Sequence, residues 1–174
     1  MINFRIIARA FSQVLIFEGA FMLLAGAVSW IYNEPSASSF LFSALITLIT
    51  GILVFTPLRN EEKVYGTRGG FIINTCIWIL FSAFGSLPFL FSSSAGNFTD
   101  AFFESISGFT TTGATIFTDI ESLPHGILLW RSLTQWLGGI AIIMLSFYVV
   151  PVIKSLNIQL SNSEFSGQMT AKIN

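Results

Sequence analysis

The sequence predicts an all-α integral membrane protein: two N-terminal transmembrane helices, then a long helix, a half-length helix, a loop and a last long helix. Hydrophobic residues make up 53% of the 174 residues, and charged residues make up only 10%. Soluble domains carry about 25% charged residues. Four long apolar segments approach the roughly 20 residues that cross a bilayer, and a shorter one lies between the last two.

The four predicted spans cover residues 11–32, 40–55, 71–91 and 127–150. Trp30 and Tyr32 close the first span with aromatic rings, which are typical of the membrane interface. The second span is somewhat short, and Pro57 ends it. Arg5 and Arg9 followed by an apolar run also resemble a cleavable signal peptide. We favour a retained helix, because the apolar run continues past the small residues at 25–27.

The positive charges predict the topology. Four crossings place seven of the eight Lys and Arg residues on one side of the membrane. The positive-inside rule makes that side, with the N-terminus, cytoplasmic. The seven residues are Arg5, Arg9, Arg59, Lys63, Arg68, Lys154 and Lys172.

The segment 97–116, NFTDAFFESISGFTTTGATI, carries the candidate functional site. Residues 97–107 predict an amphipathic helix too short to cross a bilayer, with Asn97 or Thr99 as its N-cap. A hydroxyl-rich loop around Gly113 follows. Non-helical backbone at membrane depth occurs only where it is buried in protein or lines a watery path. The segment therefore indicates an ion-conducting loop.

The loop has the groups that a dehydrated potassium ion needs. Backbone carbonyls aimed at an axis can replace the hydration shell of the ion, and the negative end of the short helix lies beside them. We expect potassium to bind at Thr111, Thr112 and Gly113. The alternative is a threonine-rich external turn. The complete predicted ion-binding loop is Thr110, Thr111, Thr112, Gly113, Ala114 and Thr115.

Several residues around the loop are candidates for its support. Asp100 and Glu104 lie one turn apart on the short helix and could attract cations or bond to backbone behind the loop. Arg131 is expected to brace that helix or to pair with one of these acids. Gly138 and Gly139 allow close helix packing or a bend in the last helix. Glu18, inside the first span, is either functional, satisfied by a neighbouring helix, or protonated.

Other functional classes have little support. A net charge of −1 gives no electrostatic argument for nucleic acid. His125 has no second His or Cys near it, so we expect no metal cofactor there. The single cysteine, Cys76, cannot form an intrachain disulfide. A membrane enzyme is poorly supported, and a non-transporting scaffold or regulatory subunit remains the alternative to ion transport.

The chain resembles a known family at these residues. Two stretches resemble the first pore repeat of the TrkH/TrkG/KtrB superfamily of potassium transporters. They are FFESISGFTTTGATI and LPHGILLWRSLTQWLGGIAIIML. The two preceding spans resemble the additional N-terminal helix pair of the TrkH branch. The likeness covers essentially the whole chain. Ala141 departs from the glycine that family members commonly carry there, and we expect a mild packing effect.

The resemblance implies a pore of four non-identical repeats, each with an outer helix, a pore helix, a filter loop and an inner helix. It also implies a homodimer in the bacterial inner membrane and a cytosolic nucleotide-binding regulator of the TrkA type. Gly113 matches the filter glycine. No cofactor is implied, since potassium is the transported ion.

The predicted domain organisation contains one such repeat. Residues 1–58 form the two-helix unit, 59–70 a cytoplasmic loop, 71–154 the pore repeat and 155–174 a polar tail. Three further repeats would be needed to complete a pore. We therefore expect a fragment or a truncated product that does not conduct alone.

Overall fold

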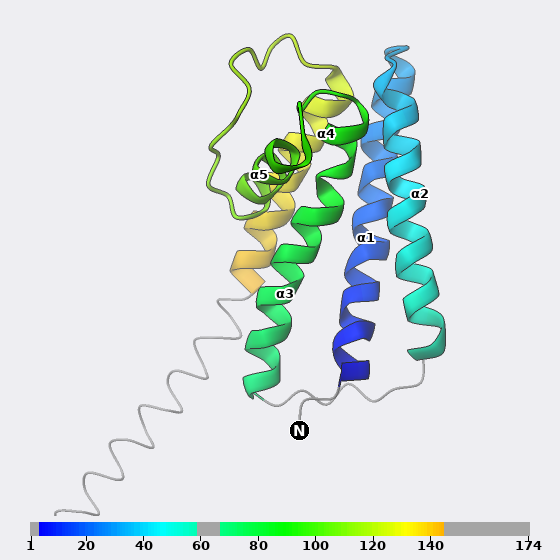
Figure 1. The fold of residues 1–174 in the computed structure, drawn as a ribbon, viewed down its shortest axis with the longest axis vertical. Helices are drawn as coiled ribbons and strands as arrows, with labels where there is room; N and C mark the ends of the chain where they lie inside the picture. The colour runs from blue at the N-terminus through cyan, green and yellow to red at the C-terminus, as the bar shows by residue number, and fades with distance from the viewer. Residues whose placement is uncertain (1–3, 59–66, 145–174) are drawn as a thin grey trace, which may run out of the picture. The chain divides into compact units, whose positions relative to one another are not determined.

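The computed structural model describes residues 4–58 and 67–144, and all regular secondary structure in these ranges is helical (Figure 1). This confirms the predicted all-α class. The chain divides into two units between Gly138 and Gly139. The helices are α1 (Phe4–Ile31), α2 (Ser36–Phe55), the 3-10 turn η1 (Thr56–Leu58), α3 (Thr67–Gly85), α4 (Leu87–Phe91), α5 (Phe98–Phe109) and a last helix, His125–Met144.

In the part of the chain that the structure describes, three helices are long and apolar enough to cross a membrane: Ala8–Ile31, Ser36–Leu58 and His125–Met144. The second is therefore not short, because α2 begins at Ser36 rather than at residue 40. Within the described residues the predicted third span contains only a shorter apolar helix, Thr75–Phe91. A complete crossing by the third predicted span, 71–91, therefore stays a prediction. The end of the last predicted span, 145–150, and the tail 155–174 lie outside the described residues.

The first two helices form a hairpin joined by a short turn at residues 32–35. Asn33 adopts φ 55°, a left-handed conformation that asparagine tolerates well. Small residues let the helices approach closely: a Cβ on Gly51 would lie 2.9 Å from Ile16 Cγ1 and 3.1 Å from the Ser12 carbonyl. Met22, Ala25, Phe40 and Ala44 fill the contact and are fully buried.

The predicted third span is interrupted between α3 and α4. Pro88 lies in the first turn of α4 and has no N–H group with which to continue the backbone hydrogen bonds of α3. The buried indole of Trp130 donates to the Gly85 carbonyl, 2.9 Å away. A side chain of the last helix thus satisfies the final carbonyl of α3. α3 begins at Thr67, so residues 67–70 are helical rather than part of the predicted loop, whose residues 59–66 are not described.

The half-length helix α5 packs on α3 and α4. Figure 1 shows the chain after α5 starting partway along the neighbouring helices and returning as a loop to the end where the last helix begins. Phe109, at the end of α5, is buried between Phe81 of α3 and Trp130, with ring centroids 4.8 and 6.4 Å away. The apolar core therefore fixes the end of α5 from which the candidate loop departs.

Candidate functional site

Asn97 starts α5, as one of the two predicted caps. Its side-chain oxygen accepts from the Asp100 N–H at 2.9 Å, and its amide nitrogen donates to Asp100 Oδ2 at 2.9 Å. This reciprocal pair satisfies an N–H group that the first turn of a helix leaves free. The Asp100 carboxylate is therefore bonded to the N-cap residue at the start of α5.

The end of α5 is closed by two backbone hydrogen bonds. Thr111 N–H donates to the Gly108 carbonyl at 2.9 Å, and Thr112 N–H donates to the Ser107 carbonyl at 3.0 Å. This is the Schellman pattern, in which the residue after the cap adopts a left-handed conformation and is usually glycine. Here that residue is Thr111, with φ 57°. A β-branched residue in this region is strained, and such strain is concentrated at functional sites.

Gly113 gives the loop its second left-handed residue, with φ 76°. A Cβ built on Gly113 would meet nothing within 4 Å. The backbone conformation, rather than a lack of space, therefore requires glycine here. Within the described residues, no N–H or O–H group donates to the carbonyls of Thr111, Thr112 or Gly113. These three acceptors are available to a ligand.

Hydroxyl groups hold both edges of the loop. Ser107 Oγ, on α5, donates to the Ala114 carbonyl at 2.6 Å. Thr110 Oγ1 donates to the Ile106 carbonyl at 2.7 Å and lies 2.9 Å from Thr112 Oγ1. The Ala114 carbonyl is thus turned toward α5, in contrast to the three free carbonyls before it. Ser107 is a supporting residue that was not predicted from the sequence.

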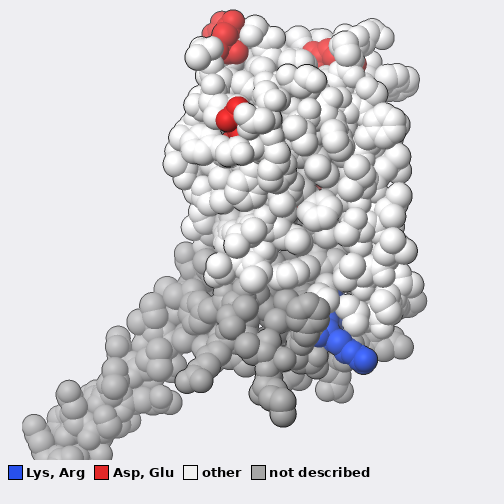
Figure 2. Space-filling model, viewed as in Figure 1, with Lys and Arg blue, Asp and Glu red and all other residues white. Residues whose placement is uncertain are grey.

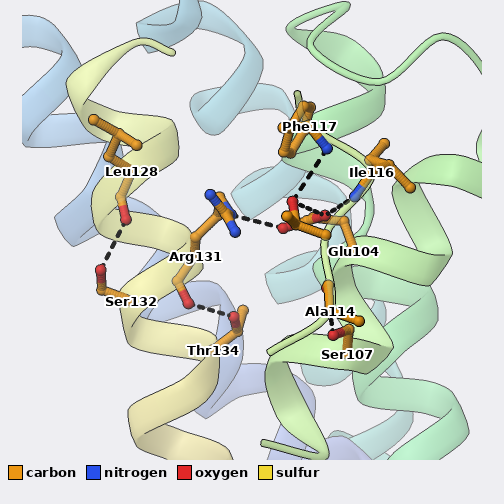
Figure 3. Close-up of polar contacts among 10 residues, drawn as sticks. Glu104, Ser107, Ala114, Ile116, Phe117, Leu128, Arg131, Ser132 and Thr134 are labelled. Atoms are coloured by element: carbon orange, nitrogen blue, oxygen red, sulfur yellow. Dashed lines mark hydrogen bonds and ion pairs between the residues drawn. The ribbon is translucent and has the colours of Figure 1, made fainter. Parts of the chain in front are cut away.

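Glu104 joins α5 to the far side of the loop (Figure 3). Its Oε2 accepts from Thr115 Oγ1 at 2.9 Å and from Ile116 N–H at 3.1 Å. Its Oε1 accepts from Arg131 Nε at 2.6 Å, and both side chains are largely buried. Of the two roles left open for this carboxylate, the structure shows bonding to backbone behind the loop.

Arg131 links the last helix to the same loop. Its guanidinium pairs with Glu104 and lies 5.5 Å from the centre of the Phe117 ring (Figure 3). Of the two acids considered as partners, Glu104 is therefore the one contacted. Because its charge is paired, Arg131 does not present a bare cation to the loop.

Glycines bring the last helix close to α5. A Cβ on Gly138 would collide with the carbonyl of Phe109, and one on Gly108 would collide with Thr134 Oγ1. Gly139 differs, since its Cβ would meet nothing within 4 Å. Close approach thus requires Gly138 and Gly108, and Gly108 was not identified from the sequence.

The turn between α1 and α2 caps the last helix. Glu34 Oε1 accepts from the His125 backbone N–H at 2.7 Å and lies 2.8 Å from the His125 ring Nδ1. Its Oε2 accepts from Gly126 N–H at 3.2 Å. Burial raises the pKa of Glu34, but these hydrogen bonds lower it more, so the net pKa falls below its usual 4.5. The N-terminal hairpin is therefore tied to the start of the last helix.

Comparison with known proteins identifies close relatives. Residues 36–174 match the TrkH family of cation transport proteins. The Trk system potassium uptake protein TrkH of Salmonella typhimurium (strain LT2) is 38% identical over 168 residues, which are 96% of this chain and 35% of that protein. The Trk system potassium uptake protein TrkG of Escherichia coli (strain K12) is 35% identical over 147 residues, 84% of this chain and 30% of that protein.

A solved structure supports the same relationship. The crystal structure of the potassium transporter TrkH from Vibrio parahaemolyticus matches with a TM-score of 0.79 and 34% identity, covering 86% of this chain and 32% of that chain. The chain spans about a third of the length of the curated relatives it matches. The chain belongs to the TrkH family and is a membrane protein.

Proposed function

We propose that this member of the TrkH family contributes one wall of a potassium-selective pore, with Thr111, Thr112 and Gly113 as its filter. The observation that carries the proposal is a non-helical loop whose three free carbonyls follow directly on a half-length helix. The relatives are named as potassium uptake proteins and a potassium transporter, in agreement with this assignment.

In the proposed mechanism, potassium sheds water and takes up carbonyl oxygens in its place. The strained Thr111 and the left-handed Gly113 give the loop a backbone shape that an ordinary strand or helix would not have. Ser107 and Glu104 hold the flanks of the loop at Ala114 and Ile116. The C-terminal end of α5 adds a partial negative charge beside the ion path.

We place the protein in a bacterial inner membrane, with the N-terminus and the side that carries most of the Lys and Arg residues facing the cytoplasm. Figure 2 supports this orientation: described Lys and Arg side chains appear at one end of the molecule, and Asp and Glu side chains at the other. Asp119 and Glu121 lie in the exposed loop between the filter and the last helix. This acidic end would face outward and attract cations.

A complete pore in this proposal needs four such walls, of which this chain supplies one. Alone, the chain is not expected to conduct. The family resemblance extends the proposal to a homodimer and to a cytosolic, nucleotide-binding regulator of the TrkA type. Two segments are candidates for a regulator-binding surface, 59–68 and the tail after residue 154, and the favoured alternative is that they are simply solvated. Both lie mostly outside the described residues.

A substitution at Gly113 tests the filter assignment. Alanine in a left-handed conformation costs about 1–2 kcal/mol, and no steric clash contributes, because a Cβ there meets nothing within 4 Å. In the assembled transporter, Gly113→Ala should lower the potassium-to-sodium preference of uptake by up to about tenfold, the limit reached when the whole strain of about 1.4 kcal/mol falls on the potassium-bound loop. Uptake would be measured in a bacterium that lacks its own potassium uptake systems.

Gly96→Ala is the matched control. Gly96 is an exposed loop glycine without a positive φ, and its Cβ would come no closer than 3.9 Å to Asp100 Oδ2. It should leave both uptake and ion preference unchanged. If Gly113→Ala reaches the membrane in normal amounts and keeps the same preference, the loop is a structural turn, and the scaffold or regulatory role replaces transport.

A further inference from the structure

Glu18 is a fully buried carboxyl group in the middle of α1. Its side chain has 0% exposure within this chain. Neither carboxyl oxygen has a hydrogen-bond partner among the described residues. The polar contacts that fix Glu104 and Glu34 are thus missing at Glu18, although it is the most deeply buried of the three.

A second unpartnered oxygen lies beside Glu18. Ser105, on α5, is also fully buried, and its hydroxyl has no partner in the described structure. Both groups border the space that glycine leaves open at position 85. A Cβ built on Gly85 would lie 2.7 Å from Ser105 Oγ and 2.9 Å from Glu18 Oε1. Helices α1, α3 and α5 therefore bring a carboxyl and a hydroxyl to one buried point.

An ionised carboxylate at this point would be very costly without a cation, so the charged groups of the surrounding elements are decisive. α2 has no ionisable residue, and α3 has Cys76 and, at its opposite end, Arg68. α5 offers only two acids, Asp100 and Glu104.

The remaining cations lie elsewhere. Arg131 of the last helix is paired with Glu104, and His125 is at the Glu34 contact. On α1 itself, Arg9 is about 13 Å along the helix axis from Glu18, at 1.5 Å per residue. Among the residues whose side chains the structure describes, none therefore supplies a positive charge at contact distance from Glu18.

We propose that Glu18 and Ser105 form a proton-binding site behind the half-length helix. The Glu18 carboxyl holds a proton at pH 7, and Ser105 Oγ is its hydrogen-bonding neighbour after a small side-chain rotation. Ser105 adjoins Glu104 in the sequence, so the site lies one residue from the carboxylate that holds the candidate filter. This inference is independent of the proposed function, because it needs neither conduction nor an assembled pore.

Infrared spectroscopy of the purified protein in lipid tests the site directly, by comparing spectra in water and in deuterium oxide and spectra of the wild type and its variants. The wild-type spectrum at pH 7 should contain the C=O stretch of a protonated carboxylic acid that shifts in deuterium oxide. Glu18→Gln should remove this band. Glu121→Gln, the same change at an exposed loop acid, should leave it intact.

Ser105→Ala provides a test that keeps Glu18 in place and does not depend on Glu18→Gln folding. Loss of the hydroxyl neighbour should move the band to higher wavenumber. Replacing sodium with choline should leave the band unchanged. The proposal is overturned if no such band exists at pH 7, if Ser105→Ala leaves the band in place, or if the band appears only when sodium is withdrawn, which would indicate a sodium site.

Discussion

The carboxylate of Glu104 offers a sharp test of how the loop is held. Glu104→Gln keeps the shape of the side chain but removes its charge. The native carboxylate accepts from Arg131 Nε, Thr115 Oγ1 and Ile116 N–H at 2.6, 2.9 and 3.1 Å. A glutamine has one oxygen with which to accept and an NH₂ group that cannot accept, so it cannot serve both the arginine and the loop.

The expected loss follows from these contacts. A hydrogen bond to a charged group contributes about 1.5–3 kcal/mol, and glutamine keeps one side of the interaction. We expect Glu104→Gln to lower the free energy of unfolding by about 2 kcal/mol. Glu104→Ala, which leaves Arg131 buried without a partner, should cost about 3–5 kcal/mol.

Denaturant-induced unfolding in mild detergent measures both losses, and uptake assays report the potassium-to-sodium preference. Asp100→Asn is the matched control, one turn earlier on α5. Its carboxylate contacts Asn97 at the partly exposed start of the helix, away from the loop. Asp100→Asn should leave the ion preference unchanged. Glu104→Gln should weaken the preference, because Thr115 and Ile116 lose hydrogen bonds that hold the loop.

A double-mutant cycle with Arg131→Gln isolates the pair. Neutralising both partners removes the unpaired buried charge, so the two changes should be non-additive by about 0.5–3 kcal/mol. Additive losses, together with unchanged ion preference in Glu104→Gln, would refute the assignment of Glu104 as the residue that positions the loop.

Three further perturbations probe the packing around the site. Gly138→Ala should destabilise the protein by about 2 kcal/mol in denaturant unfolding, because its Cβ would collide with the Phe109 carbonyl, whereas Gly139→Ala should be neutral or slightly stabilising. Trp130→Phe leaves the last carbonyl of α3 without its buried donor and should cost about 1–3 kcal/mol by the same measurement, with ion preference retained. The pKa of Glu34 is lowered in the folded state, so its contribution is present above pH 4.5 and is lost as pH falls below that value. The melting temperature should therefore drop less on acidification in Glu34→Gln than in the wild type, and equal pH profiles would argue against the cap.

Local signals in the sequence predicted much of the structure. Asn97 caps α5 because a short polar side chain can bond to the N–H three residues on, and the following apolar spacing marks the helix. Asn33 and Pro35 mark the turn between the first two helices. These features depend on neighbouring residues, so a single sequence contains the information needed to find them.

Contacts between distant segments were not predictable in the same way. Glu34 caps a helix that starts 91 residues later, and nothing in the local pattern around either residue indicates the partner. Thr111 takes the left-handed position where glycine is expected, so the pattern pointed to Gly113 alone as the special backbone residue. For Arg131, chemistry limited the partner to an acid on α5, and only the structure distinguished Glu104 from Asp100.

The strain at Thr111 gives a useful distinction between stability and selectivity. Thr111→Gly should relieve about 1 kcal/mol of left-handed strain. Because glycine adopts the same conformation, Thr111→Gly should be more stable and keep its ion preference if the backbone shape alone serves the filter.

The central claim is that the carbonyls of Thr111, Thr112 and Gly113 bind a dehydrated alkali ion. The most direct measurement is the anomalous diffraction of rubidium in crystals of the assembled transporter grown with rubidium in place of potassium. An anomalous peak is expected in direct contact with these three carbonyls, and it should be lost in Gly113→Ala. A well-ordered loop without rubidium beside it, with the ion bound elsewhere along the pore, would contradict the claim.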